Sequence, residues 1–271
     1  MLLALDVGNT QTVVGLYDVE ATDANVDRRA ADTSLIDHWR IATNVERTAD
    51  EHALVLQEFL GFHGSTWEDS DVEGIVVCSS VPRVTGALRR MSERYFGMAA
   101  LVVEPGVRTG LPILYDNPKE VGADRIADAV AAYDLFGGPT IVVDFGTATT
   151  FEAISAKGEY LGGAIFPGID ISLDALFVRA AALRRVELVE PRNVIGRSTV
   201  ESMQSGAIYG YTSLVDGMCE RIRNELDADA TVVATGGLSD LIGPLSAAIT
   251  HVEPWLTLHG LRLIFEKNVD A

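Results

Sequence analysis

Short apolar runs that end at an aspartate mark two similar segments of the chain. The runs Leu2–Leu5 and Thr140–Val143 lead to Asp6 and Asp144, and each aspartate precedes a glycine-containing turn and a second β-rich run. A strand, a tight turn and another strand predict a β-hairpin in each segment. The two aspartates stand about half the chain apart, each two residues before a glycine, which indicates a weak internal duplication.

Hydrophobic periodicity predicts strands and helices along the rest of the chain. Further strands are expected at 38–43, 74–78, 101–103, 161–167 and 231–235. Helices are expected at 49–60, 88–96, 121–135, 172–183, 199–226 and 239–249. In the first of these helices Leu54, Val55 and Phe59 should lie near one face. An exposed excursion is expected at 20–36, and the glycines and prolines of 106–118 indicate a boundary between two lobes, 1–117 and 118–271, of an α/β protein.

The composition is typical of a folded, acidic protein. Of the 271 residues, 48% are hydrophobic and 22% are charged, which excludes a disordered chain. The formal net charge of −18 disfavours a nucleic-acid partner, because such binding needs a basic face. No apolar stretch approaches the roughly 20 residues of a membrane span, and Cys78 and Cys219 are expected to be reduced core thiols in apolar surroundings. We therefore expect a soluble, cytoplasmic protein with no membrane or nucleic-acid partner.

The two hairpin turns are candidate phosphate-binding loops. In Asp6-Val7-Gly8-Asn9-Thr10 the glycine lets backbone N–H groups approach an anion, the next two side chains add donors, and the aspartate can hold Mg²⁺. An ordinary hairpin turn is the alternative for this motif alone. The segment DFGTATT at 144–150 repeats the acid and the glycine, which a purely structural turn would not require. We expect the two turns to face each other across a cleft and to clamp one polyphosphate, with the glycines of 235–237 against the nucleoside.

A third candidate site is Gly122-Ala123-Asp124-Arg125, which precedes a predicted helix. A carboxylate beside an arginine stays ionised and can accept the proton of a substrate hydroxyl during phosphoryl transfer. The arginine can hold an anionic substrate or the transferring phosphoryl group. The alternative is an aspartate that caps the helix N-terminus and forms a surface ion pair. The chain lacks both the P-loop and the dinucleotide-binding glycine motif.

Together these segments resemble the type III pantothenate kinases, which catalyse the first step of coenzyme A synthesis. The resemblance covers nearly the whole chain, and the central segment with its GADR core is the most specific part. The matching segments are DVGNT at 6–10, WRIAT at 39–43, YDNPKEVGADRIADAVAAY at 115–133, DFGTATTF at 144–151, GGAIFPG at 162–168, STVESMQSGAIYG at 198–210 and ATGG at 234–237. The family belongs to the acetate and sugar kinase/Hsp70/actin superfamily. The resemblance therefore implies two ribonuclease H-like (actin-like ATPase) lobes with a duplicated core of β-sheet and helices.

The resemblance also implies a role for individual residues. Asp124 would accept the proton of the primary hydroxyl of pantothenate, and Asp144 would bind a monovalent cation, K⁺ or NH₄⁺, while Mg²⁺ would arrive on the nucleotide. From the residues alone, Mg²⁺ would be the first choice at Asp144. Contacts to ATP are expected from Asp6, Val7, Gly8, Asn9, Thr10, Gln11, Thr12, Val13 and Thr147. Contacts to pantothenate are expected from Tyr115, Gly122, Ala123, Asp124, Arg125 and Thr199.

The activity implied is ATP-dependent phosphorylation of pantothenate to 4'-phosphopantothenate by a homodimer whose second lobe supplies the interface. The stretch 199–226 is compatible with such an interface and equally with a core helix. Two alternatives stay open: a non-catalytic regulatory relative, and a kinase of the same superfamily acting on another small hydroxyl or acid acceptor. The excursion at 20–36 is longer than is usual in the family and touches none of the matching positions.

Overall fold

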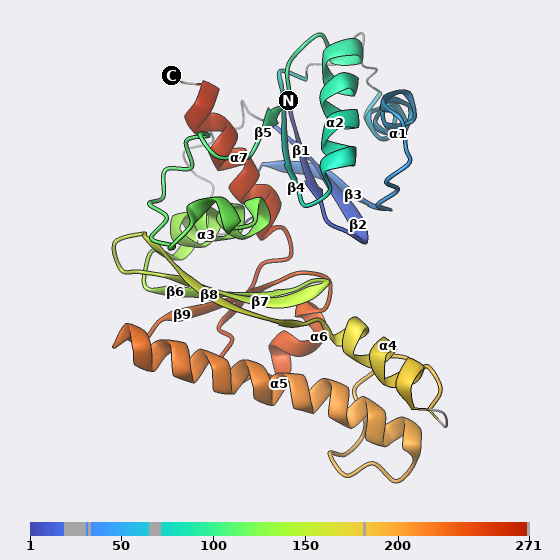
Figure 1. Ribbon diagram of the computed structural model, residues 1–271, viewed down its shortest axis with the longest axis vertical. Helices are drawn as coiled ribbons and strands as arrows, with labels where there is room; N and C mark the ends of the chain where they lie inside the picture. The colour runs from blue at the N-terminus through green and yellow to red at the C-terminus, as the bar shows by residue number, and fades with distance from the viewer. Residues whose placement is uncertain (19–30, 32–33, 65–71, 181–182, 270–271) are drawn as a thin grey trace. The chain divides into compact units, whose positions relative to one another are not determined.

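The computed structural model describes residues 1–18, 31, 34–64, 72–180 and 183–269. Contacts within the chain divide it into two units, which are described separately below (Figure 1). Unit 1 comprises Met1–Pro112, Asp116–Ala131 and Leu256–Ala271, and unit 2 comprises Ile113–Tyr115 and Ala132–Trp255. The lobe boundary after residue 117 stays a prediction, but by contacts both ends of the chain belong to unit 1. Most of the expected excursion at 20–36 lies outside the described residues.

Unit 1 is built on a five-stranded mixed sheet with the order β3-β2-β1-β4-β5. Its central strand, β1, is antiparallel to β2 and parallel to β4, and its residues Leu2–Leu5 are buried on both faces. Burial on both faces explains why this strand is an unbroken apolar run in the sequence. The strands are β1 (Leu2–Val7), β2 (Gln11–Tyr17), β3 (Leu35–Ala42), β4 (Gly74–Ser79) and β5 (Leu101–Val102).

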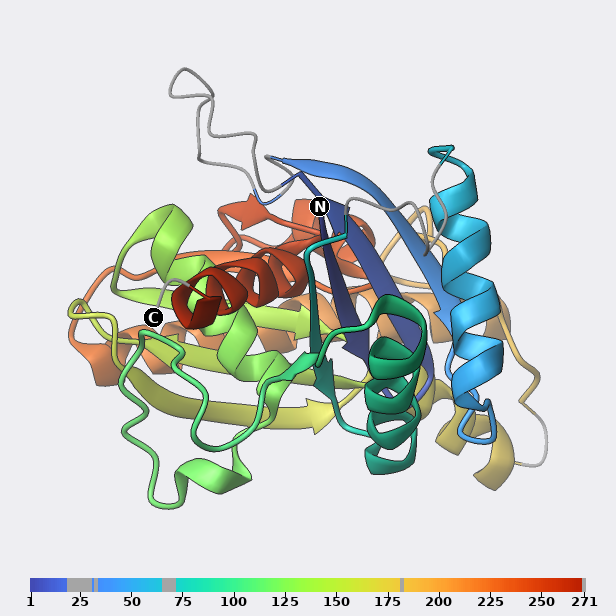
Figure 2. The same ribbon diagram turned by 90° about the horizontal axis from the view of Figure 1, so that it is seen from above.

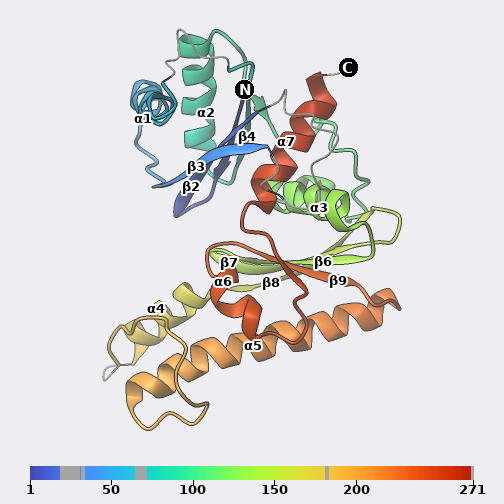
Figure 3. The same cartoon turned by 180° about the vertical axis from the view of Figure 1, so that it is seen from behind.

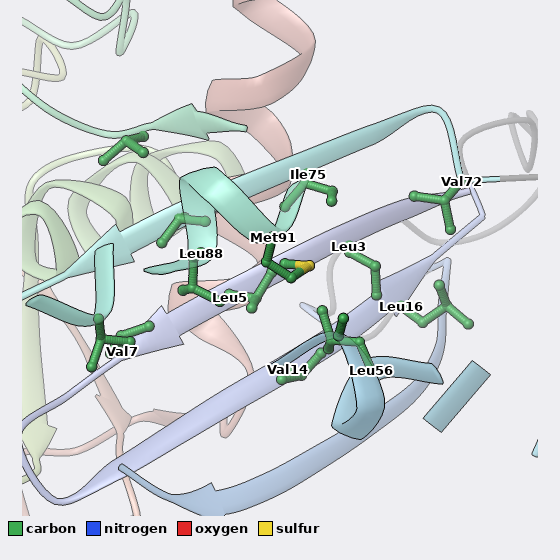
Figure 4. Close-up of a cluster of buried hydrophobic side chains, with 14 of the residues drawn as sticks. Leu3, Leu5, Val7, Val14, Leu16, Leu56, Val72, Ile75, Leu88 and Met91 are labelled. Atoms are coloured by element: carbon green, nitrogen blue, oxygen red, sulfur yellow. The ribbon is translucent and has the colours of Figure 1, made fainter. Parts of the chain in front are cut away.

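Helices cover both faces of the unit 1 sheet (Figures 1 and 2). On one face α1 (Ala49–Gly61) and α2 (Pro82–Met91) enclose a core that contains Leu3, Leu5 and Val7 of β1 (Figure 4). On the other face α7 (Leu256–Val269) lies close to the sheet, because glycines replace side chains there: a Cβ on Gly74 would lie 2.0 Å from the ring of Phe265. Since side chains alternate along a strand, Asp6 faces the α7 side. Unit 1 also holds η1 (Ser92–Phe96), η2 (Pro118–Glu120) and the start of α3 (Ala123–Phe136).

Unit 2 is built on a second five-stranded mixed sheet with the order β10-β9-β6-β7-β8. The long helix α5 (Thr199–Leu226) covers one face of this sheet, where its buried residues Ile208, Val215 and Cys219 join a core with β6 and β9 (Figure 3). The strands are β6 (Thr140–Phe145), β7 (Ala148–Ile154), β8 (Tyr160–Pro167), β9 (Thr231–Thr235) and β10 (His251–Val252). The other helices are α4 (Ile169–Arg179), α6 (Ser239–Ile242) and η3 (Gly243–Leu245).

The two sheets repeat one topology, which confirms the predicted duplication. In each sheet the first strand pairs antiparallel with the second (β1–β2 and β6–β7) and parallel with a later strand (β1–β4 and β6–β9). Read from the antiparallel edge, the orders β3-β2-β1-β4-β5 and β8-β7-β6-β9-β10 correspond strand for strand. Asp6 and Asp144 therefore occupy equivalent places near the ends of central strands, β1 and β6.

Three sequence predictions about helices were wrong. The closing helix expected at 239–249 is only the short α6 followed by η3, and the helix α7, which was not predicted, ends the described chain. Helix α2 starts at Pro82 rather than at residue 88, since proline is well suited to the first turn of a helix. Leu54 is 63% exposed, because α1 buries Ala53, Leu56 and Leu60 instead. Among the described residues, no helix combines the length and apolar character needed to cross a membrane.

Candidate active site

The first phosphate turn joins β1 to β2 in unit 1. The backbone N–H of Gly8 donates to the carbonyl of Gln11 (3.0 Å), and Asn9, Thr10 and Gln11 are exposed. Thr43, just after β3, braces this turn: its hydroxyl donates to the Gly8 carbonyl (2.7 Å) and its N–H donates to the Thr10 carbonyl (2.9 Å). The turn is thus held in place while its tip stays accessible to a ligand.

Asp6 lies directly before this turn and is partly buried. The pKa of Asp6 is raised to about 6, because burial and the nearby charge of Asp124 raise it by more than a hydrogen bond from Cys78 and the charge of Arg40 lower it. The Cys78 thiol donates to Oδ1 of Asp6 (3.1 Å). The prediction that Cys78 is buried is confirmed, but its surroundings are not purely apolar, and the pKa of its thiol is raised well above the ordinary value by burial and by Asp6.

Asp124 lies in the first turn of α3, in unit 1, and is partly buried. Its Oδ1 accepts the backbone N–H of Arg125 (2.8 Å), and a Cβ on Gly122 would lie only 2.3 Å from the same oxygen. Glycine at 122 therefore leaves room for the carboxylate. The N–H of Ile126 donates to the carbonyl of Gly122 (3.1 Å), so the helix starts from Gly122 and Asp124 is not its N-cap residue. Arg125 is 9% exposed.

A third carboxylate, Asp128, follows one turn later in α3 and was not predicted as part of the site. Asp128 is 1% exposed and accepts a hydrogen bond from the hydroxyl of Thr257 in α7 (2.7 Å). Its charge, like those of Asp6 and Asp124, raises the pKa of the Cys78 thiol. The signal in the sequence was the spacing of the two α3 aspartates, because residues four apart share a helix face. Unit 1 therefore brings three carboxylates together around the end of β1.

Unit 2 holds Asp144 at the end of β6, beside the second glycine turn. The N–H of Gly146 donates to the carbonyl of Ala148 (3.0 Å), much as Gly8 does in the first turn. Gly236 follows β9 with a φ of +88°, and a Cβ there would lie 2.3 Å from Oδ1 of Asp144. The glycine predicted to lie against a nucleoside thus makes room for the Asp144 carboxylate. Register pairs Asp144 with Thr150 of β7, so both side chains share one face of the sheet.

The remaining predicted site residues of unit 2 lie in two different places. Tyr115 is half-buried against β8, where its ring centroid lies 6.2 Å from that of Tyr160. Thr199, the first residue of α5, is exposed and lines a groove of about 820 Å³ between α4 and α5. The contacts described within unit 2 do not join Tyr115 to Thr199. Thr147 lies in the β6–β7 turn, where its carbonyl accepts the N–H of Gly168 (3.1 Å).

Comparison with known proteins decides the family. A family model described as type III pantothenate kinase matches residues 2–221. A type III pantothenate kinase of Streptomyces griseus subsp. griseus is 54% identical over 277 residues, covering 100% of this chain and 99% of the relative. The chain belongs to the type III pantothenate kinase family. The resemblance carried by the sequence motifs is therefore confirmed.

Solved structures support the fold of this pantothenate kinase family member. A Campylobacter jejuni protein assigned to the Baf family of transcriptional activators is similar with a TM-score of 0.57 at 18% identity, covering 99% of this chain and 100% of the other. A Sinorhizobium meliloti protein assigned as a 2-dehydro-3-deoxygalactonokinase is similar with a TM-score of 0.55 at 12% identity, covering 98% and 96%. At such identities the likeness concerns the fold alone. It agrees with the predicted α/β, actin-like ATPase class.

The surroundings of Asp144 fit the monovalent cation that the family resemblance implies. The hydroxyl oxygen of Thr150 is buried on the Asp144 face, and it has no hydrogen-bond partner among the described residues. A carboxylate and an unpartnered hydroxyl are both oxygen donors, which suit a hard cation. Gly236 approaches the carboxylate closely enough that a Cβ there would lie 2.3 Å from Oδ1 of Asp144. The donor set at this place is therefore compatible with K⁺ or NH₄⁺.

Proposed function

We propose that this kinase transfers the γ-phosphoryl group of ATP to the primary hydroxyl of pantothenate, with Asp124 as the proton acceptor. The product would be 4'-phosphopantothenate, the first intermediate of coenzyme A biosynthesis. The observation that supports Asp124 most strongly is its place in the first turn of α3, where its charge acts on Asp6 beside the phosphate turn. A base within the field of the phosphate site is what transfer to a hydroxyl requires.

The phosphate turn of unit 1 would hold the nucleotide. Asn9, Thr10 and Gln11 are exposed and carry backbone and side-chain donors of the kind that bind phosphate oxygens, and the Thr43 hydroxyl supports the turn through the Gly8 carbonyl. Val7 and Thr12 are buried, so we assign them to support of the turn rather than to direct contact through their side chains. Mg²⁺ bound with the nucleotide would neutralise charge on the transferring phosphoryl group. The Asp6 carboxylate, two residues before Gly8 of the turn, could serve as an oxygen ligand for this ion.

Proton transfer is the part of the reaction that this chain performs with its own side chain. As the pantothenate oxygen bonds to the γ-phosphorus and the bond to the β-phosphate oxygen breaks, the hydroxyl proton passes to the Asp124 carboxylate. Asp124 is suited to this role because one of its oxygens is held by the Arg125 N–H (2.8 Å), which fixes the orientation of the carboxylate. Gly122, Ala123 and Arg125 would contact pantothenate from the same turn. The contacts of Tyr115 and Thr199 with pantothenate stay a prediction from the family resemblance.

A monovalent cation, K⁺ or NH₄⁺, would bind at Asp144 and Thr150 in unit 2. The Thr150 hydroxyl, which is buried and has no hydrogen-bond partner among the described residues, supports this assignment. Thr147, in the adjoining turn, would contact ATP. We expect turnover of this enzyme to depend on one of these ions.

A homodimer formed through unit 2 is the assembly we propose. Large apolar side chains are exposed around the α4–α5 groove: Ile195 is 82% exposed, Val178 81% and Val194 66%. Exposed apolar patches of this kind mark association surfaces. Helix α5 also leaves open space for close packing at three glycines. A Cβ added at Gly206, Gly210 or Gly217 would have no neighbouring atom within 4 Å outside the helix's own backbone. The cytoplasmic location stays a prediction.

A coupled assay of ADP formation tests the proposal. Turnover should require pantothenate and should rise with K⁺ or NH₄⁺ compared with a sodium control. Turnover with another small hydroxyl or acid acceptor but not with pantothenate would favour a different kinase of the superfamily. A folded protein that binds ATP and turns over none of these acceptors would favour the regulatory alternative.

A further inference from the structure

We propose that Arg40 is a phosphate-binding residue of the nucleotide site, and that its guanidinium group pairs with an oxygen of the β- or γ-phosphate of ATP. This inference rests on the proposed function, because it deepens the assignment of the β1–β2 turn to ATP. Neither the composition nor the matching segments assigned a role to Arg40, although it stands inside the WRIAT segment at 39–43.

The strand register places Arg40 in one row with the acidic centre of unit 1. Arg40 of β3 pairs with Val13 of β2, Val13 pairs with Asp6 of β1, and Asp6 pairs with Cys78 of β4. Residues paired in this way point to the same face of a sheet. Arg40 thus stands two strands from Asp6, at about 10 Å between backbones given a strand spacing of about 4.8 Å, which a long side chain can span.

The neighbouring residue confirms which face Arg40 occupies. Trp39 stacks on Phe59 of α1 with ring centroids 4.8 Å apart, so Trp39 lies on the face covered by α1 and α2. Because side chains alternate along a strand, Arg40 lies on the opposite face. That is the face of Asp6, and the charge of Arg40 reaches the Asp6 carboxylate. Arg40 is exposed and lies on an edge strand of the sheet.

The charges of unit 1 explain why a cation is needed there. Asp6 and Asp124 act on each other, and a triphosphate would add several more negative charges beside them. Arg40 is the cationic side chain that acts on Asp6, and within the described part of the chain it forms no ion pair with an acidic group. Its donors are therefore available to a ligand. A guanidinium fork matches two phosphate oxygens, and such charge-assisted bonds are stronger than neutral ones.

Arg40 is also linked mechanically to the phosphate turn. It lies three residues before Thr43, whose hydroxyl holds the Gly8 carbonyl and pairs with the hydroxyl of Thr12 (2.8 Å). Strand β3 therefore carries Arg40, and the residue directly after this strand, Thr43, supports the turn. A phosphate bound at the turn and Arg40 would be positioned by the same strand.

Direct binding of ATP with Mg²⁺, measured by calorimetry without pantothenate, tests this role. Arg40→Ala should weaken ATP binding about 10- to 100-fold, the range of a lost charge-assisted contact, and should leave pantothenate binding within twofold. Arg40→Lys should recover part of the loss, because it keeps the charge without the fork. Arg90→Ala is the matched control, since Arg90 is an exposed arginine of α2, on the other face of the same sheet. The affinity of the Arg90→Ala variant for ATP should stay within twofold of wild type.

The outcomes separate this inference from the proposed function. A folded Arg40→Ala protein that binds ATP within twofold of wild type overturns the role of Arg40, as does one that loses only pantothenate affinity. If the wild-type enzyme shows no pantothenate-dependent turnover while Arg40→Ala still weakens ATP binding, the proposed function fails and the role of Arg40 stands. Circular dichroism and thermal unfolding confirm that each variant is folded.

Discussion

The thiol of Cys78 donates a hydrogen bond to Oδ1 of Asp6 at 3.1 Å, and the two residues sit side by side on parallel strands β4 and β1. The pairing of these two strands, which are far apart in sequence, brings a buried thiol next to the aspartate that precedes the first phosphate turn. The thiol is one of few groups that favour the ionised form of Asp6. Burial and Asp124 act in the opposite direction and prevail, since the pKa of Asp6 is raised to about 6.

Replacement of Asp6 by Asn should change how stability depends on pH. Since the pKa of Asp6 rises from 3.8 to about 6 on folding, its favourable contribution is complete below pH 3.8 and is lost as the pH rises through about 6. We compare the unfolding free energy of the ligand-free Asp6→Asn variant with that of the wild type. The variant's value minus the wild-type value should be about 2–3 kcal/mol larger at pH 8 than at pH 4. Urea unfolding at both pH values measures this difference. A difference between the two proteins that is the same at pH 4 and pH 8 would contradict the raised pKa.

Thr43→Val should impair ATP binding without removing any residue that faces the ligand. The valine keeps the shape of the side chain but loses the hydrogen bond to the Gly8 carbonyl (2.7 Å), so the phosphate turn loses its brace. We expect the KM for ATP to rise about 3- to 10-fold, as for a hydrogen bond worth about 1 kcal/mol, and the KM for pantothenate to stay near wild type. Thr212→Val is the control, because Thr212 donates to the carbonyl of Ile208 within α5 of unit 2 (2.8 Å) and not to the phosphate turn. Equal effects of the two substitutions would count against the bracing role.

Gly236→Ala should remove most of the stimulation by K⁺. The added Cβ would lie 2.3 Å from Oδ1 of Asp144, at a φ of +88° that favours glycine, so the carboxylate must move. We expect turnover to lose most of its dependence on K⁺ and the unfolding free energy to fall by about 1–3 kcal/mol. Gly217→Ala should keep K⁺ stimulation, because a Cβ added at this helical glycine would have no neighbouring atom within 4 Å. Normal K⁺ stimulation in a folded Gly236→Ala protein would rule out the proposed cation site.

Ile195→Asp should disrupt the proposed homodimer. Ile195 is 82% exposed beside the α4–α5 groove, so a charge there costs little in the monomer but must be desolvated in an interface. Light scattering coupled to gel filtration should show a shift from dimer to monomer. Leu54→Asp serves as the control, because Leu54 of α1 is 63% exposed in unit 1 and its variant should remain dimeric. A dimer that persists in Ile195→Asp would place the interface elsewhere.

Much of the fold could be predicted because its signals are local. The bounds of α5 and β9 follow directly from their periodicity and flanking residues, and the repeated Asp-x-Gly turn revealed the duplication of the two sheets. Helix α7 was missed, although Leu258, Leu261 and Ile264 are buried at helical spacing. Its burial depends on glycines of the distant strands β2 and β4, whose role cannot be seen before the sheet is assembled.

The candidate site could be predicted only where its signals are local in the sequence. The acidic and glycine residues of the two turns and of the GADR segment form recognisable patterns, so Asp6, Asp124 and Asp144 could be singled out. Cys78 and Arg40 acquire their meaning only from strand register, which joins residues more than thirty positions apart in sequence. Thr150 becomes a candidate cation ligand only once its hydroxyl is seen to be buried without a partner among the described residues.

Single-turnover formation of 4'-phosphopantothenate by wild type and Asp124→Asn tests the central claim most directly. With both enzymes saturated by ATP, pantothenate and K⁺, rapid quenching isolates the chemical step from substrate binding. We predict that Asp124→Asn binds both substrates within a few-fold of wild type and forms product at least about 100-fold more slowly, the scale expected of a general base. A variant that forms product within a few-fold of the wild-type rate would contradict the assignment of Asp124 as the proton acceptor.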